Sequence, residues 1–206
     1  MTKTQKIRWI AKPLVFTAGL LPALWIAALT VLKPSALGAN PVEALLDHFG
    51  IWAMWFMLIA LAVTPVRKLL GWPSLSRFRR MLGLYAFFYV FMHFLTWLVL
   101  DQGLEPGPII EDIARRPFIT IGMVAFVLLL AMAATSFARA RQRMGRSWQT
   151  LHNSVYLVGI LGVWHYWWQV RADFAEPLLY AVILTALLGY RVFDQMRRPA
   201  RRVANA

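Results

Sequence analysis

The sequence predicts an all-α integral membrane protein, a bundle of six transmembrane helices with both termini in the cytoplasm. Two observations support this fold class. The 206 residues are 60% hydrophobic and only 15% charged, and the mean hydropathy is +0.57, values typical of a membrane protein rather than a soluble domain. The charged residues also alternate in sign between successive connecting segments, as expected for a chain that crosses a bilayer repeatedly.

Six apolar runs are long enough to cross a membrane. A span needs about 20 mostly apolar residues, because an α-helix rises ~1.5 Å per residue through ~30 Å of hydrocarbon. The runs are 13–32, 50–66, 81–100, 118–137, 151–168 and 177–193. The first lacks a small-residue cleavage site, so we expect an uncleaved helix. No internal repeat is evident, and residues 1–206 are interpreted as one transmembrane domain.

Basic residues collect in alternate connecting segments, on one side of the predicted membrane. They are Lys3, Lys6, Arg8 and Lys12; Arg67, Lys68, Arg77, Arg79 and Arg80; Arg139, Arg141, Arg143 and Arg146; and Arg191, Arg197, Arg198, Arg201 and Arg202. The other side holds Lys33, Arg115, Arg116 and Arg171, with every acidic residue except Asp194. The positive-inside rule places the basic side in the cytoplasm.

The net charge of +13 therefore indicates topology and contact with anionic membrane lipid, not nucleic acid binding. The absence of cysteine excludes disulfides, thiolate-bound metals, iron–sulfur clusters and covalently attached heme. No P-loop, G-x-G-x-x-G or H-E-x-x-H motif is visible. Any electrons that pass through this chain must come from another protein or a diffusible carrier.

Three of the four histidines fall in predicted spans, where a polar ring is costly to bury, and so indicate a functional site. His93 and His165 lie at similar depth, toward the outer side, on helices that run in the same direction. They could face each other and ligate one iron as a bis-histidine b-type heme. The alternative is a buried histidine bonded to a neighbouring carbonyl or hydroxyl. His48, beside Asp47, is most simply a loop or helix-start residue.

His152 precedes His165 by thirteen residues on the same predicted helix and lies near its cytoplasmic end. About 20 Å of helix separates the two positions, so they cannot serve one metal. His152 could ligate a second, inner heme; alternatively it is an interfacial ring. The inner site lacks a second histidine, because Arg80 stands thirteen residues before His93 and Met81 is only a weak thioether candidate.

Three arginines before the third span are candidates for binding the anionic parts of a cofactor. Arg77, Arg79 and Arg80 lie at the cytoplasmic edge and could pair with heme propionates or a flavin phosphate. They could equally serve only as topology signals in a basic segment.

Two arginines before the fourth span oppose the charge pattern of the outer side. Arg115 and Arg116 could hold outer heme propionates or dock a partner. Alternatively they pair with Glu111 and Asp112 in the same segment.

Several stretches carry a resemblance to a known family: RRMLGL at 79–84, RRPFITIG at 115–122, WQTLHNSVYL at 148–157, GLLP at 19–22 and GANPV at 38–42. Together they closely resemble the MsrQ family, formerly called YedZ, of the ferric reductase-like transmembrane superfamily. The resemblance covers essentially the whole chain. Larger members of the superfamily carry two histidines on each of two helices, whereas here the inner position of the third span is not histidine.

The resemblance implies a multi-pass protein of the bacterial inner membrane that binds one or two b-type hemes and FMN. The heme ligands it implies are His93 and His165 at the outer site and His152 at the inner site. Electrons would come from quinol or a cytosolic flavin reductase. They would pass to MsrP, a periplasmic molybdopterin enzyme that reduces methionine sulfoxide in proteins, so the catalysis would lie in that partner of a heterodimer.

Two other functions are left open by the sequence. The first is a related heme membrane reductase with another acceptor, ferric iron or superoxide/oxygen. The second is a non-redox, proton-coupled transporter in which the histidines form a proton relay. A purified protein without a Soret band would favour the transporter.

Overall fold

Helices form every regular element in residues 2–204, the part of the chain that the computed structural model describes. They are α1 (Lys3–Lys6), η1 (Ile7–Ala11), α2 (Lys12–Leu32), η2 (Pro34–Leu37), α3 (Pro41–Leu69), η3 (Pro73–Phe78), α4 (Arg79–Leu95), η4 (Thr96–Asp101), α5 (Pro106–Arg115), α6 (Pro117–Ala134), α7 (Ala138–Met144), α8 (Arg146–Asn153), α9 (Val155–Gln169) and α10 (Ala175–Ala204). The side chains of Lys3, Arg198, Arg201 and Arg202, which belong to the predicted basic side, lie outside the described residues.

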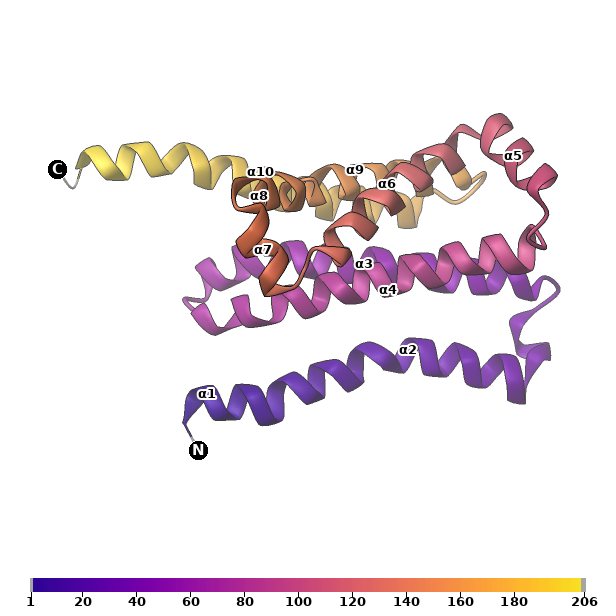
Figure 1. Cartoon of the computed structure of the whole chain (residues 1–206), viewed down its shortest axis with the longest axis horizontal. Helices are drawn as coiled ribbons and strands as arrows, with labels where there is room; N and C mark the ends of the chain where they lie inside the picture. The colour runs from indigo at the N-terminus through magenta and orange to yellow at the C-terminus, as the bar shows by residue number, and fades with distance from the viewer. Residues whose placement is uncertain (1, 205–206) are drawn as a thin grey trace.

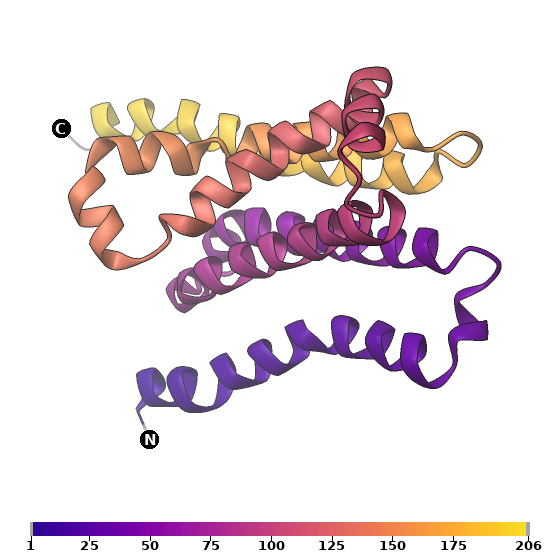
Figure 2. The same ribbon diagram turned by 45° about the vertical axis from the view of Figure 1, so that its right-hand side comes forward.

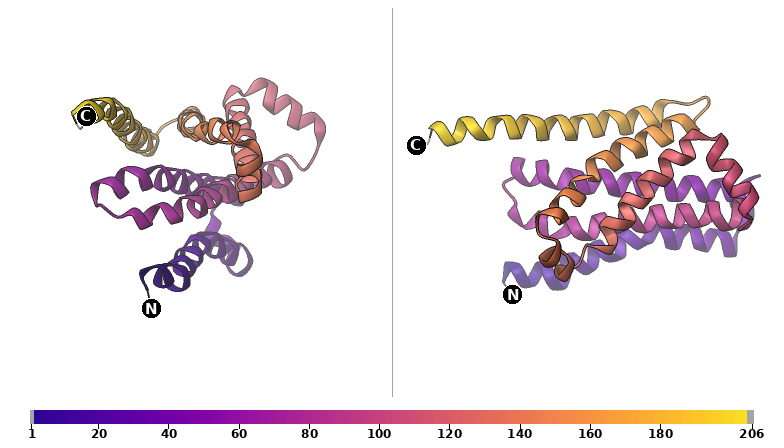
Figure 3. Two further views of the ribbon diagram at one scale, coloured as in Figure 1. Left: turned by 60° about the vertical axis from the view of Figure 1, so that its left-hand side comes forward. Right: turned by 45° about the horizontal axis from the view of Figure 1, so that its top comes forward.

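The long helices form three layers, with α3 and α4 in the middle (Figures 1 and 3). α2 lies on one side of this pair, and α6, α9 and α10 lie on the other. Aromatic packing joins the middle layer: the Phe56 ring of α3 stacks on Tyr85 and Tyr89 of α4, at centroid distances of 5.1 and 5.2 Å. Close packing of this kind is what holds helices together in lipid, where apolar burial gives little driving force.

Polar contacts at a proline attach α2 to the middle layer, from which it stands apart in Figure 2. Pro22 lies inside α2 and has no N–H, so backbone groups of the adjacent turn lose their helical partners. The buried Tyr89 hydroxyl donates to the Gly19 carbonyl at 2.7 Å and accepts from the Ala23 N–H at 3.2 Å. His48 Nε2 donates to the Pro22 carbonyl at 3.0 Å. In lipid such groups need a protein partner, and these side chains supply it.

The prediction that His48 belongs to a loop or helix start is wrong. α3 begins nine residues before the predicted span, because Asn40 caps it and Pro41 occupies its first turn. The Asn40 side chain accepts from the Glu43 N–H at 3.3 Å. An apolar-run criterion does not detect these polar first turns, so His48 is helical and ties α3 to α2.

Five helical stretches of the described residues are long and apolar enough to cross a membrane: Thr4–Leu32, Pro41–Leu69, Pro73–Asp101, Pro117–Ala134 and Ala175–Arg197. The predicted fifth span, 151–168, is divided between α8 and α9, and α9 has 15 residues. His152 and His165 therefore do not lie on one helix, contrary to prediction. The division falls at Ser154, whose N–H and hydroxyl both turn back to the Leu151 carbonyl, at 3.1 and 2.5 Å.

The bundle has two chemically different ends. We call the end that carries α7 and α8 the basic end and the end that carries α5 the acidic end (Figure 1). α1 and the far end of α10 both lie at the basic end. This agrees with termini on one side of a membrane; the six-span count and the direction of insertion stay predictions.

Candidate functional site: a cavity between two histidines

A cavity of about 960 Å³ lies between α3, α4, α6 and α9. Its wall is mostly apolar and includes Met54, Met57, Phe94 and Phe126. Near the acidic end the lining becomes charged, with Asp101, Asp112, Arg116 and Arg171. A large apolar cavity with a few convergent polar groups is the usual form of a cofactor site.

The two histidines predicted to share a site lie together in this cavity. His93 comes from α4 and His165 from α9, and both line the wall. Their ring centroids are 6.1 Å apart, and the ring planes are perpendicular, at 90°.

Each of these rings is oriented by one backbone carbonyl. His93 Nδ1 lies 2.9 Å from the Leu46 carbonyl of α3, and His165 Nδ1 lies 2.7 Å from the Phe118 carbonyl of α6. A carbonyl can only accept, so Nδ1 carries the proton on both rings and Nε2 keeps its lone pair. A hydrogen bond to a backbone carbonyl was the predicted sign of a purely structural histidine. The same hydrogen bond also orients histidines that bind metals, so it is compatible with both roles.

The spacing of the rings fits one metal ion between them. Metal–imidazole bonds of about 2 Å, placed in line with two ring radii of about 1 Å each, give a centroid separation of about 6 Å. No cluster of three or more His, Cys, Asp or Glu side chains suited to a metal exists among the described residues. The pair is therefore suited to a metal whose other ligands come from a prosthetic group, as in a heme.

The third predicted ligand, His152, lies outside this cavity. Its Nδ1 is 3.0 Å from the Trp148 carbonyl, and its ring stacks on the Trp148 ring at 3.8 Å. The same Trp148 ring also contacts Arg141, whose guanidinium carbon lies 5.7 Å from the ring centroid. Within the described residues, the structure brings no second histidine to His152.

Of the three arginines predicted at the basic end, Arg79 is the one whose side chain enters a polar cluster. Its Nη2 donates to Thr64 Oγ1 at 2.6 Å, although Arg79 is exposed, as are Arg77 and Arg80. Arg191 of α10 donates to the same hydroxyl at 3.2 Å and also to Tyr156 Oη. This role of Arg191 was not predicted, because it depends on the packing of α10 on α3.

We call Arg67, Arg79 and Arg191 the arginine cluster. The charges of Arg67 and Arg191 act on Arg79, and the Nε atoms of Arg67 and Arg191 are buried without a hydrogen-bond partner among the described groups. None of the ion pairs found between described side chains involves these three residues. Like charges with unused donors in this position are suited to hold an anion.

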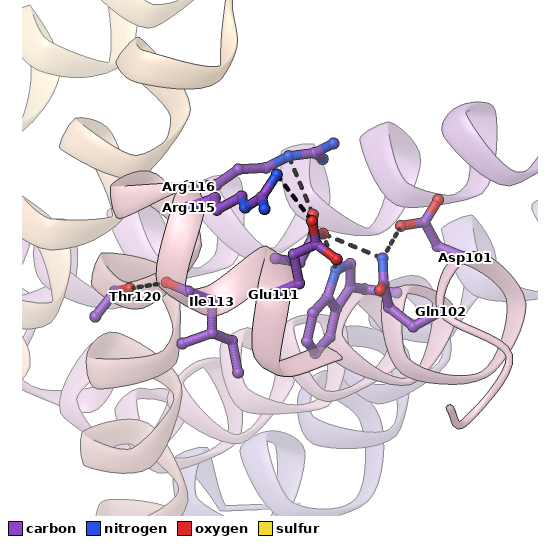
Figure 4. A network of polar contacts seen from close by, with 9 residues as sticks. Asp101, Gln102, Glu111, Ile113, Arg115, Arg116 and Thr120 are labelled. Atoms are coloured by element: carbon purple, nitrogen blue, oxygen red, sulfur yellow. Dashed lines mark hydrogen bonds and ion pairs between the residues drawn. The ribbon is translucent and has the colours of Figure 1, made fainter. Parts of the chain in front are cut away.

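Arg115 and Arg116 each form the ion pair that was one of their predicted roles; the role in holding propionates or docking a partner stays a prediction. Arg115 pairs with Glu111 at 2.9 Å, and Arg116 pairs with Asp112 at 3.1 Å. Figure 4 shows this network at the acidic end, where Gln102, the residue after η4, donates to Asp112 of α5 at 3.1 Å. Arg116 nevertheless lines the cavity, whereas Arg115 lies on the surface with 78% of its side chain exposed.

Two glycines in the site were not predicted. Gly50 of α3 lies against the His93 ring, and Gly122 of α6 lies against the His165 ring. The signal that could have found them is the spacing: each glycine follows by one helical turn the residue whose carbonyl orients the histidine.

The chain is similar in sequence to a known family of transmembrane proteins and to several bacterial proteins. Residues 49–163 match the family model described as "Ferric reductase like transmembrane component". The chain is 47% identical over 192 residues to a Bordetella pertussis protein, covering 91% of each. It is 51% identical over 159 residues to a Ralstonia nicotianae protein, covering 76% of this chain and 73% of the relative. It is 43% identical over 211 residues to a Xanthomonas oryzae pv. oryzae protein, covering 99% and 97%.

Each of these three relatives is named "Protein-methionine-sulfoxide reductase heme-binding subunit MsrQ". No solved structure is significantly similar to the chain.

Proposed function

We propose that this chain, which belongs to the MsrQ family of ferric reductase-like transmembrane proteins, is an inner-membrane b-type cytochrome that passes electrons to a periplasmic methionine sulfoxide reductase. The observation that carries the proposal is the pair His93 and His165, whose rings lie 6.1 Å apart and bond through Nδ1, so that Nε2 keeps its lone pair on each ring. The heme-binding name of the relatives supports the same identity for the group held there.

In this proposal His93 and His165 would hold the iron of the outer heme. When bound, the heme supplies one-electron transfer at a potential that its surroundings set. The Leu46 and Phe118 carbonyls keep both rings in the tautomer that offers Nε2. The apolar wall excludes water, and Arg116 and Arg171 are the cavity-lining cations suited to the propionates.

The direction of electron flow follows from the two ends of the bundle. The basic end faces the cytoplasm by the positive-inside rule, and the α8–α9 segment supplies the fifth of six spans. The chain would therefore receive electrons from quinol or a cytosolic flavin reductase at this end and deliver them at the acidic end, toward which His93 and His165 lie. His152, at the basic end, is the ligand of a second, inner heme.

The arginine cluster and its neighbours bind the anionic group of a cofactor at the cytoplasmic end. Arg79 and Arg191 converge on Thr64, and neither forms an ion pair with a carboxylate among the described side chains, which suits the phosphate of FMN or an inner heme propionate. Arg77 and Arg80 are exposed at the same edge and are available to the same ligand.

The periplasmic partner in this proposal is a molybdopterin enzyme of the MsrP type, which forms a heterodimer with this chain and reduces methionine sulfoxide in oxidised proteins. The acidic outer segments would steer a partner with a complementary surface. This chain then acts as the electron-transfer subunit.

Replacing either cavity histidine tests the proposal. We expect His93→Ala and His165→Ala to lose the low-spin absorbance of the outer heme and all electron delivery to MsrP, because one axial ligand is removed. The matched control is His48→Ala, which removes a histidine outside the cavity.

The readouts are the heme-to-protein ratio, the reduced-minus-oxidised spectrum and the rate of heme reoxidation by MsrP. A His165→Ala protein with the full heme content and spectrum would refute the ligand assignment. Reoxidation by ferric chelates or oxygen but not by MsrP would instead show that the acceptor is wrong.

A further inference from the structure

Although no internal repeat is evident from the sequence, the carbonyl, glycine and histidine of the site occur twice in the chain with one spacing. Residues 46, 50 and 93 become 118, 122 and 165 on a shift of 72 positions. The first set belongs to the packed pair α3 and α4, and the second to the packed pair α6 and α9. Each histidine is separated by 47 residues from the carbonyl that orients it. The cavity is thus built from two equivalent helix pairs, each of which presents one ring.

Within each pair, the glycine lies one turn beyond the orienting carbonyl on the same helix face. A Cβ added at Gly122 would lie 2.9 Å from both Cε1 and Nδ1 of His165. A Cβ added at Gly50 would lie 3.3 Å from Nδ1 and 3.5 Å from Cε1 of His93. Both glycines sit in ordinary helical conformation, so the backbone does not need glycine here. Glycine is needed because the imidazole ring occupies the space that a Cβ would fill.

We propose that Gly50 and Gly122 are positioning residues for the heme ligands, and that each forms with its upstream carbonyl a cradle that fixes one imidazole. The carbonyl fixes the Nδ1 edge of the ring, and the bare glycine lets that edge lie against the helix. Nε2 is bonded to Cε1, so any group that displaces this edge of the ring also displaces Nε2. This inference rests on the proposed role of His93 and His165 as ligands.

The two contacts predict unequal effects of alanine. At 2.9 Å the His165 ring cannot stay in place beside a methyl group, and the neighbouring atoms are a ring held by a hydrogen bond rather than a flexible tip. At 3.3 Å the His93 ring needs to move by only a few tenths of an ångström. Gly122→Ala should therefore disturb the outer heme strongly, and Gly50→Ala should disturb it mildly.

The matched control is Gly83→Ala in α4, where an added Cβ has no neighbour within 4 Å. It makes the same helix-stabilising change and leaves both cradles untouched. The purified, heme-loaded proteins are compared by heme-to-protein ratio, by the electron paramagnetic resonance spectrum of the oxidised outer heme and by its midpoint potential.

We expect Gly122→Ala to lose at least half of its outer low-spin signal or to convert it to high spin. Added imidazole should restore the low-spin spectrum by replacing the displaced ring. Gly50→Ala should keep the heme and shift its g values, and Gly83→Ala should match wild type. If the Gly122→Ala protein accumulates poorly, the shift in the g values of Gly50→Ala alone tests the positioning role.

Wild-type spectra in both cradle variants would overturn the positioning role while leaving the ligand assignment intact. Equal losses in Gly83→Ala would also overturn it, because they would show a general effect of alanine. A wild-type protein without heme would instead remove the proposed function itself.

Discussion

Tyr89 offers a quantitative test of how α2 is attached to the bundle. Its ring is fully buried, and its hydroxyl serves two backbone groups of α2, the Gly19 carbonyl and the Ala23 N–H. Tyr89→Phe removes both hydrogen bonds while the ring can still stack on Phe56. Net values of about 0.5–1.5 kcal/mol per bond in proteins, and about 0.6 kcal/mol on average in membranes, give an expected loss of about 1–3 kcal/mol.

The neighbouring Tyr85 supplies a matched control for this change. Its hydroxyl makes one bond to α2, donating to the Phe16 carbonyl at 2.5 Å. Tyr85→Phe should therefore cost about half as much as Tyr89→Phe.

The assay is equilibrium unfolding in mixed micelles, with hydrogen exchange used to locate the loss in α2. Neither residue lines the histidine cavity, so both variants should retain their heme. A Tyr89→Phe protein as stable as wild type, or less affected than Tyr85→Phe, would refute the claim that these hydroxyls hold α2.

Two further predictions concern the basic end. If His152 holds an inner heme as proposed, His152→Ala should lower the heme-to-protein ratio by one and keep the outer low-spin spectrum, since His152 lies outside the cavity; a pyridine hemochrome assay measures the ratio, and loss of the outer signal as well would contradict separate sites. Arg191→Gln should weaken FMN retention by about tenfold to a hundredfold, because a charged hydrogen bond contributes about 1.5–3 kcal/mol. Fluorimetry of released flavin measures this, with the exposed Arg139→Gln as a charge-matched control, and equal loss in both variants would argue against a site at the cluster.

Much of the fold could be predicted because a bilayer imposes a simple requirement on helix length and apolarity. The runs 13–32 and 118–137 closely match α2 and α6. The predicted helix boundaries are wrong where local polar groups determine where a helix begins or ends. Asn40 and Pro41 start α3 early, and Ser154 divides α8 from α9 through its bonds to Leu151. Neither effect changes the apolar content on which the prediction depended.

The candidate site was predicted in part, because histidines in apolar runs are conspicuous whereas their supports are not. Equal depth on two helices was enough to anticipate that His93 and His165 would meet, and the structure brings them together. The orienting groups are a backbone carbonyl and a glycine, which carry no chemical signature of their own in a sequence. The fate of Arg115 and Arg116 depended on which side chains of α5 came within reach, and Glu111 and Asp112 did.

The shift of 72 positions also bears on why the basic end has one histidine. The same shift relates position 80 to position 152, so Arg80 stands where an equivalent of His152 would be. The helix pairs agree at the acidic end, where carbonyl, glycine and histidine recur. They differ at the basic end. His152 stacks on Trp148 within α8, a helix separate from α9, and Arg80 is exposed at the start of α4. The repeated helix pair therefore accounts for a symmetric outer pair, whereas any inner heme has to be held by His152 and groups that the repeat does not supply.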